Sequence, residues 1–127
     1  MIQKGTLLNI VDNSGARYVY CIDVVTGFKR KWAYLGDIVK VVVYSLRKRR
    51  RFESKVRKGE IYKALIVRTK IPLSYKSNDS IFFLENSAIL LNETNKIIGT
   101  RIFGFVPKIL RKTRFMRVIS TAKGFKL

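Results

Sequence analysis

The sequence predicts an all-β fold: a small five-stranded antiparallel closed barrel with a β-hairpin extension and short C-terminal helices. Three features support this prediction. Strand-like runs alternate with a period of two, turn residues separate them at short intervals, and no long helical periodicity occurs before the C-terminal part. Closure also suits a chain of 127 residues because it removes exposed sheet edges. We expect a single domain, 1–127, with the barrel in 1–99 and a short helical part in 100–127.

The first four strands are marked by β-branched and aromatic residues. They are predicted over 6–11, 17–25, 38–44 and 61–67. Glycine–acid pairs at 36–37 and 59–60 indicate turns before the third and the fourth, and Pro72 cannot continue the ladder of the fourth.

The second half of the chain is less regular. The polar stretch 74–80 is a loop or a hairpin tip, and 81–84 with 88–91 suggests a hairpin joined through 85–87. Gly99 and Gly104 bracket a short extended segment, which indicates tight backbone packing at a corner. One or two short helical segments are expected within 108–120.

The charge is far from balanced. The chain has 27 Lys and Arg, 8 Asp and Glu and no His, which gives a net charge of +19. A polyanion is therefore the expected partner, and nucleic acid fits best. A membrane surface fits poorly, because the cations are spread over strand-like segments and no apolar run approaches the ~20 residues of a spanning helix.

The cations concentrate in two regions. Arg47 to Arg51 is the densest stretch and lies in a predicted basic loop, 45–58, which is either inserted among phosphates or simply solvated. The second region follows Glu93, after which there is no acid and cations alternate with phenylalanines. These aromatic residues are Phe103, Phe105, Phe115 and Phe125. They could stack on bases, although packing a short helix onto the barrel is the more common role.

The stretch Asp12-Asn13-Ser14-Gly15 has two interpretations, an active site with Ser14 as nucleophile or a turn between strands. A nucleophilic serine needs a base, and there is no histidine. A lysine could act as the base instead, but in a chain with 15 lysines the presence of one is no evidence for catalysis. Asp, Asn, Ser and Gly are turn formers, so the turn is preferred. Cys21 is expected to be a small buried side chain. We predict no enzyme activity, no catalytic residue, no metal site and no cofactor.

Short blocks occur in a fixed order along the whole chain. They are Met1-Ile2-Gln3, Leu8-Asn9, Asp12 to Arg17, Cys21-Ile22, Gly36-Asp37-Ile38, Lys58-Gly59, Lys63-Ala64, Val67 to Lys70, Asn78 to Asn92, Gly99 to Gly104, Phe115-Met116 and Ile119-Ser120. In order and spacing they resemble the L-fourteen family of large-subunit ribosomal proteins. The resemblance implies a barrel bound to large-subunit rRNA near the subunit interface, with intersubunit bridges to small-subunit rRNA. It also implies contacts with ribosomal proteins L-three and L-nineteen and with a ribosome-silencing factor.

The resemblance and the charge together select the candidate residues. For rRNA binding they are Arg17, Lys29, Arg30, Arg47, Lys48, Arg49, Arg50, Arg51, Lys55, Arg57, Lys58, Arg68 and Lys70. For intersubunit or partner binding they are Thr100, Arg101, Arg114 and Arg117.

The chain departs from the usual family pattern at Asp79, Leu84, Ser87 and Phe105, and its 45–58 loop is longer and more basic. The chain is rich in Ile, Phe and Tyr and shows no recognisable presequence, so it looks like an organelle-encoded member of the family. We expect a mitochondrial matrix ribosome, with plastid or bacterial cytoplasm as alternatives. The alternative function is a freestanding basic barrel or translation factor that binds single-stranded RNA through exposed aromatic residues.

Overall fold

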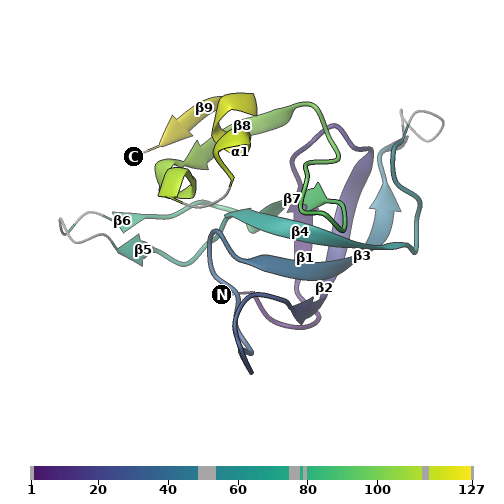
Figure 1. The fold of residues 1–127 in the computed structure, drawn as a ribbon, viewed down its shortest axis with the longest axis horizontal. Coiled ribbons are helices and arrows are strands. Elements are labelled where there is room, and N and C mark those ends of the chain that lie inside the picture. Colours follow the sequence, from purple (N-terminus) through teal and green to yellow (C-terminus); the bar gives the residue numbers. More distant parts are fainter. Residues whose placement is uncertain (1, 49–53, 75–77, 79, 113–114, 127) are drawn as a thin grey trace.

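Residues 2–48, 54–74, 78, 80–112 and 115–126 are described by the computed structural model (Figure 1). The barrel strands are β1 (Leu7–Ile10), β2 (Ala16–Val24), β3 (Ile38–Leu46), β4 (Ile61–Arg68) and β7 (Ser87–Leu91). They close in the order β1-β2-β3-β4-β7, which confirms the predicted five-stranded barrel and its first four strands.

One pair of barrel strands differs from the prediction. β1 and β7 run parallel, with Asn9 opposite Ser87 and Ile10 opposite Ala88, whereas the other four pairs are antiparallel. The reason is parity: strands that alternate in direction around a ring of five must meet once with the same direction. A closed barrel of five strands therefore cannot be antiparallel throughout.

Two apolar clusters explain the burial pattern of β4 and β7. Ala64 and Ile66 of β4 point into the barrel, while Leu65 and Val67 point outward into a second cluster beneath the C-terminal elements. Every residue of β7 is buried. Because residues 64–67 of β4 and 88–91 of β7 are covered on both faces, these stretches are continuous apolar runs rather than alternating ones.

The predicted hairpin of 81–84 with 88–91 is wrong. β6 (Ser80–Ile81) pairs instead with β5 (Leu73–Ser74), and β7 is a barrel strand between β1 and β4. The hairpin extension is thus formed by β5 and β6, and it projects away from the barrel (Figure 1).

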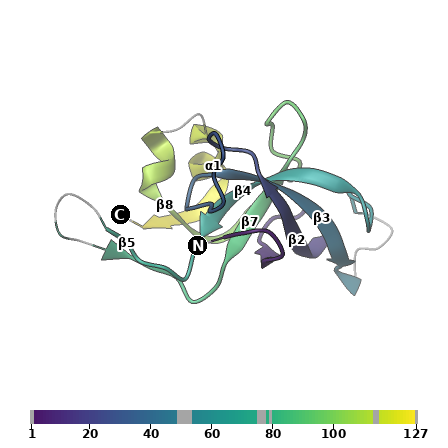
Figure 2. The same ribbon diagram turned by 90° about the horizontal axis from the view of Figure 1, so that it is seen from below.

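The C-terminal part contains strands that the sequence did not predict. β8 (Ile102–Pro107) pairs in parallel with β9 (Ala122–Lys126), and between them come the 3-10 helix η2 (Lys108–Lys112) and α1 (Met116–Thr121). The two short helical segments expected within 108–120 are confirmed. The layer packs on β4 and β7 through Val106, Leu110 and Val118, and Figures 1 and 2 show it on one side of the barrel. Within the described residues, no helix has the length and apolar character to span a membrane.

Candidate nucleic-acid interface

The corner at residues 12–15 connects β1 to β2, which confirms the turn interpretation. The Asp12 carboxylate is buried and accepts hydrogen bonds from the backbone N–H of Ser14, at 3.0 Å, and from the Ser14 hydroxyl. Its other oxygen accepts the N–H of Leu90, at 3.0 Å. Burial raises the pKa of Asp12, and the hydrogen bonds from Ser14 and Leu90 oppose that rise. Ser14 is therefore a donor within the turn and is buried with it.

The same corner holds both ends of the basic loop. The N–H of Arg47 donates to the carbonyl of Gly15 and the N–H of Lys55 to the carbonyl of Ser14, each at 2.9 Å. Gly15 has φ +104°, and a Cβ there would lie 2.9 Å from the Cα of Ser54. Only glycine combines this backbone conformation with so close an approach.

Asn13 fastens a third segment to the corner. Its Oδ1 accepts the N–H groups of Thr100, at 2.8 Å, and Arg101, at 3.2 Å, and its Nδ2 donates to Oγ1 of Thr100 at 2.8 Å. At Gly99 an added Cβ would meet Oδ1 of Asn13 at 2.8 Å. The tight packing predicted for the Gly99–Gly104 segment is thus confirmed.

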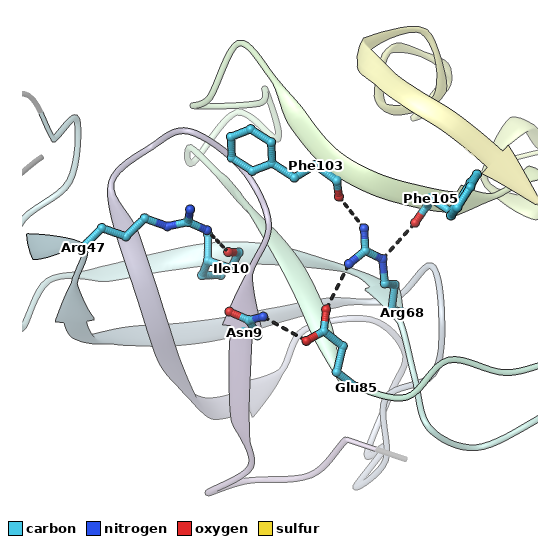
Figure 3. A network of polar contacts seen from close by, with 7 residues as sticks. All are labelled: Asn9, Ile10, Arg47, Arg68, Glu85, Phe103 and Phe105. Carbon is cyan, nitrogen blue, oxygen red and sulfur yellow. Dashed lines mark hydrogen bonds and ion pairs between the residues drawn. The ribbon is translucent and has the colours of Figure 1, made fainter. Parts of the chain in front are cut away.

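Arg47 has a largely internal role. Its guanidinium donates to the carbonyl of Ile10 at 2.9 Å (Figure 3). The guanidinium also lies over the ring of Phe103, 5.5 Å from its centre. The side chain is half-buried. It locks the start of the basic loop against β1 and β8.

Exposed cations surround this rigid corner. Lys48 follows Arg47 in the basic loop, Lys55 lies near the other end of the loop and donates to the carbonyl of Ile98 at 3.4 Å, and the backbone of Arg101 is itself bonded to Asn13. Arg17 is exposed at the start of β2. We term this set the corner site; it comprises residues 12–15, Arg17, Arg47, Lys48, Lys55, Thr100 and Arg101.

The remaining candidates lie elsewhere. Arg57 and Lys58 are exposed in the turn before β4, Lys70 is exposed after β4, and Arg117 is exposed on α1. Lys29 and Arg30 are exposed in the connection between β2 and β3. Arg49, Arg50, Arg51 and Arg114 lie outside the described residues.

Arg68 occupies a position that argues against the predicted phosphate contact. It is 9% exposed, and its guanidinium donates to the carbonyls of Phe103 and Phe105, the latter at 2.9 Å, and to Oε1 of Glu85 at 3.0 Å (Figure 3). Gly104, between the two carbonyls, has φ +78°, and a Cβ there would lie 2.9 Å from Cζ of Arg68. Arg68 therefore ties β4 to β8 from within.

Glu85 completes this internal network. Its Oε2 accepts a hydrogen bond from Nδ2 of Asn9 at 3.0 Å, so one carboxylate links Arg68 of β4 to β1 (Figure 3). Partial burial raises the pKa of Glu85, but the hydrogen bonds from Asn9 and Arg68 outweigh it and hold the pKa below its ordinary value.

The aromatic residues of the second cationic region divide between two environments. Phe103 and Phe115 are partly buried, the latter against the second apolar cluster, as expected for packing residues. Phe105 is 53% exposed and, with Phe82, Leu84 and the Arg68–Glu85 pair, lines a hollow of about 530 Å³. The side chain of Phe125 lies outside the described part of the structure. Sequence reasoning missed this hollow because its walls come from three separate segments of the chain, at Arg68, at 82–85 and at 104–105.

A comparison with protein families finds a match that spans most of the chain. The family model described as "Ribosomal protein L14p/L23e" matches residues 1–125.

Proposed function

Because the chain belongs to the ribosomal protein L14p/L23e family, we propose that it binds large-subunit rRNA through the corner site, as a structural constituent of the large ribosomal subunit. The family makes it a ribosomal constituent that binds rRNA. The observation that supports the corner site is the convergence of exposed Lys48, Lys55 and Arg101 on one hydrogen-bonded turn.

The mechanism is electrostatic and geometric. Cations that neutralise phosphates release condensed counterions, which supplies affinity without reading sequence. Because the backbones of Lys55 and Arg101 are bonded to the corner, their side chains start from fixed backbone positions, and less backbone conformational entropy is lost on binding. The barrel thus acts as a rigid support for phosphate contacts.

We also propose that the protein is not an enzyme. The Ser14 hydroxyl, the first candidate nucleophile, is buried and donates to Asp12. A serine in that arrangement forms part of a turn and is not presented to a substrate.

Finer assignments rest on the family resemblance, and we propose them on that basis. Thr100, Arg101, Arg114 and Arg117 would serve intersubunit bridges to small-subunit rRNA and docking of a ribosome-silencing factor. Ribosomal proteins L-three and L-nineteen would be protein neighbours. The exposure of Thr100, Arg101 and Arg117 is compatible with these contacts. We further propose a mitochondrial ribosome as the location.

Salt-dependent binding of an rRNA fragment tests the corner site. We expect each of Lys48→Gln and Lys55→Gln to reduce the slope of log K against log salt by about 0.7–0.9 for a large-subunit rRNA fragment. Lys40→Gln on β3 is the matched control, because Lys40 is exposed but not part of the corner site. Equal slopes for all three variants and the parent would refute the assignment of the corner site.

A further inference from the structure

The connection between β2 and β3 carries exposed aromatic and cationic side chains together. Phe28 is 89% exposed, Trp32 40% and Tyr34 41%. Lys29, Arg30 and Lys31 lie between them in sequence and are exposed as well. Large exposed aromatic residues grouped on one segment indicate a binding surface.

The backbone fixes which way two of these rings point. Between them, Ala33 is buried and pairs with Ile2, its N–H donating to the carbonyl of Ile2 at 2.7 Å and its carbonyl accepting the N–H of Ile2 at 2.9 Å. In an extended segment alternate side chains share a face, so Trp32 and Tyr34 face away from Ala33. Their backbone positions are about 6.4–6.8 Å apart along the segment.

The far end of the segment is held as well. The N–H of Tyr34 donates to Oδ2 of Asp37 at 2.8 Å, and the N–H of Asp37 donates to the carbonyl of Tyr34 at 3.0 Å. Arg30 forms an ion pair with Oδ2 of Asp37 at 3.2 Å. The aromatic positions are therefore anchored on both sides.

A hollow of about 350 Å³ opens here, lined by Lys29, Arg30, Lys31, Trp32 and Tyr34. The guanidinium of Arg30 lies over the ring of Tyr34, 5.5 Å from its centre, so one wall combines an aromatic and a guanidinium. Lys29 lies over Phe28, 5.4 Å from its ring centre, at the rim. The hollow thus presents flat π surfaces enclosed by positive charge.

We propose that this hollow receives an unpaired nucleotide of RNA, with its base stacked on Trp32 and the adjacent phosphates contacted by Lys29 and Lys31. The proposal rests on the proposed rRNA-binding function and adds a second mode of contact to it. Unstacked bases bind aromatic rings and guanidinium planes, whereas paired bases in a duplex keep their faces covered. Phosphate binding alone would require only the cations, so the aromatic walls favour a base.

Tryptophan fluorescence tests this directly because Trp32 is the only tryptophan of the chain. The full chain is titrated with a short single-stranded RNA, with an abasic oligomer of equal length and charge, and with a blunt RNA duplex. We expect quenching by the single-stranded RNA and little quenching by the other two. Equal quenching by all three would overturn base stacking. An acidic peptide is titrated in parallel, and quenching by the peptide without quenching by RNA would overturn it as well.

Substitution provides the second arm. We expect Trp32→Leu to weaken single-strand binding roughly five- to a hundredfold, because stacking on one aromatic residue contributes about that much affinity. Phe82→Leu is the control and should leave binding unchanged, because Phe82 is an exposed aromatic residue that does not line the hollow at Trp32. Unchanged binding in Trp32→Leu would also overturn the proposal.

The outcomes separate this proposal from the function beneath it. If the protein binds an rRNA fragment with a steep salt dependence but single strands do not quench Trp32, the stacking site fails and the rRNA-binding assignment stands. If neither the fragment nor the oligomers bind, the proposed corner site fails too. The quenching arm uses the unsubstituted chain, so it holds even if Trp32→Leu does not fold.

Discussion

Asp12 organises the corner through one buried carboxylate that accepts hydrogen bonds from Ser14 and from Leu90 of β7. In an asparagine, an NH₂ group would replace one of the two carboxylate oxygens. That group would face the donors of Ser14 or Leu90 and could not accept their hydrogen bonds. We therefore expect Asp12→Asn to lower the free energy of unfolding by about 1–3 kcal/mol, measured by urea denaturation. Asp23→Asn makes the same chemical change at an exposed site and should cost less than about 0.5 kcal/mol. Equal losses in both variants would contradict the role assigned to Asp12.

Glu85 gives a pH-dependent prediction with a defined sign. Its pKa is held below the ordinary value in the folded protein, so its ionised form stabilises the fold above the unfolded pKa of about 4.3. That stabilisation is lost as the pH falls through the folded pKa.

Urea denaturation as a function of pH checks this sign. We expect Glu85→Gln to be less stable than the parent near pH 7, by up to about 1 kcal/mol because the carboxylate is partly exposed, with the difference closing in acid. Glu93→Gln, at an exposed position, should show little difference at either pH. A Glu85→Gln difference that grew in acid would have the wrong sign.

The residue scale also shows what local sequence can predict. The corner was predictable because four consecutive residues are turn formers and Ser14 bonds to Asp12 within the turn. Arg68 was not, since its burial depends on carbonyls of β8 and on Glu85, which are remote in sequence. In the sequence, Arg68 follows the predicted strand 61–67 and lies close to Lys70, a position typical of an exposed cation.

At the scale of elements, the corner and the basic loop form one unit. Gly15 lets the backbone approach Ser54, and the loop ends are bonded at Arg47 and Lys55. We expect Gly15→Ala to destabilise the fold by about 1 kcal/mol or more, because φ is positive and the added methyl group meets backbone. It should also lower the hydrogen-exchange protection of the Arg47 and Lys55 amides.

Gly59→Ala is the matched control for that change. Gly59 also has positive φ, +85°, but nothing lies within 4 Å of an added Cβ. It should therefore report backbone strain alone and leave the Arg47 and Lys55 amides protected. Similar loss of protection in both variants would show that the contact with Ser54 is not what fixes the loop.

Strands were predictable where one face of the strand is buried and the other is exposed to solvent. β3 has such a pattern and was predicted closely. β7 is buried on both faces, and residues 85–87, which include its first residue, resemble a hairpin turn in the sequence. β8 and β9 pair with each other across the two short helices, in a segment with no regular alternation. Their pairing depends on the second apolar cluster, which no local window contains.

At the scale of the whole molecule, cations lie on several of the connections of a five-stranded barrel and its C-terminal layer. The chain has a net charge of +19. Such a charge favours a state in which phosphates surround the protein. We expect the full chain to co-sediment with the large subunit and to be released only at high salt, followed by immunoblotting of gradient fractions. Co-sedimentation with the small subunit alone, or with no particle, would instead favour the freestanding RNA-binding alternative.

The most direct test of the corner site is site-specific photocrosslinking in intact ribosomes, with the crosslinker placed at Lys48 and, separately, at Arg101. Both side chains are exposed and adjoin backbone held by the corner, so the crosslinks should be few and reproducible. We predict that Lys48 crosslinks to large-subunit rRNA at a defined position. Crosslinks from Lys48 to small-subunit rRNA alone, or none to rRNA in assembled particles, would contradict the account.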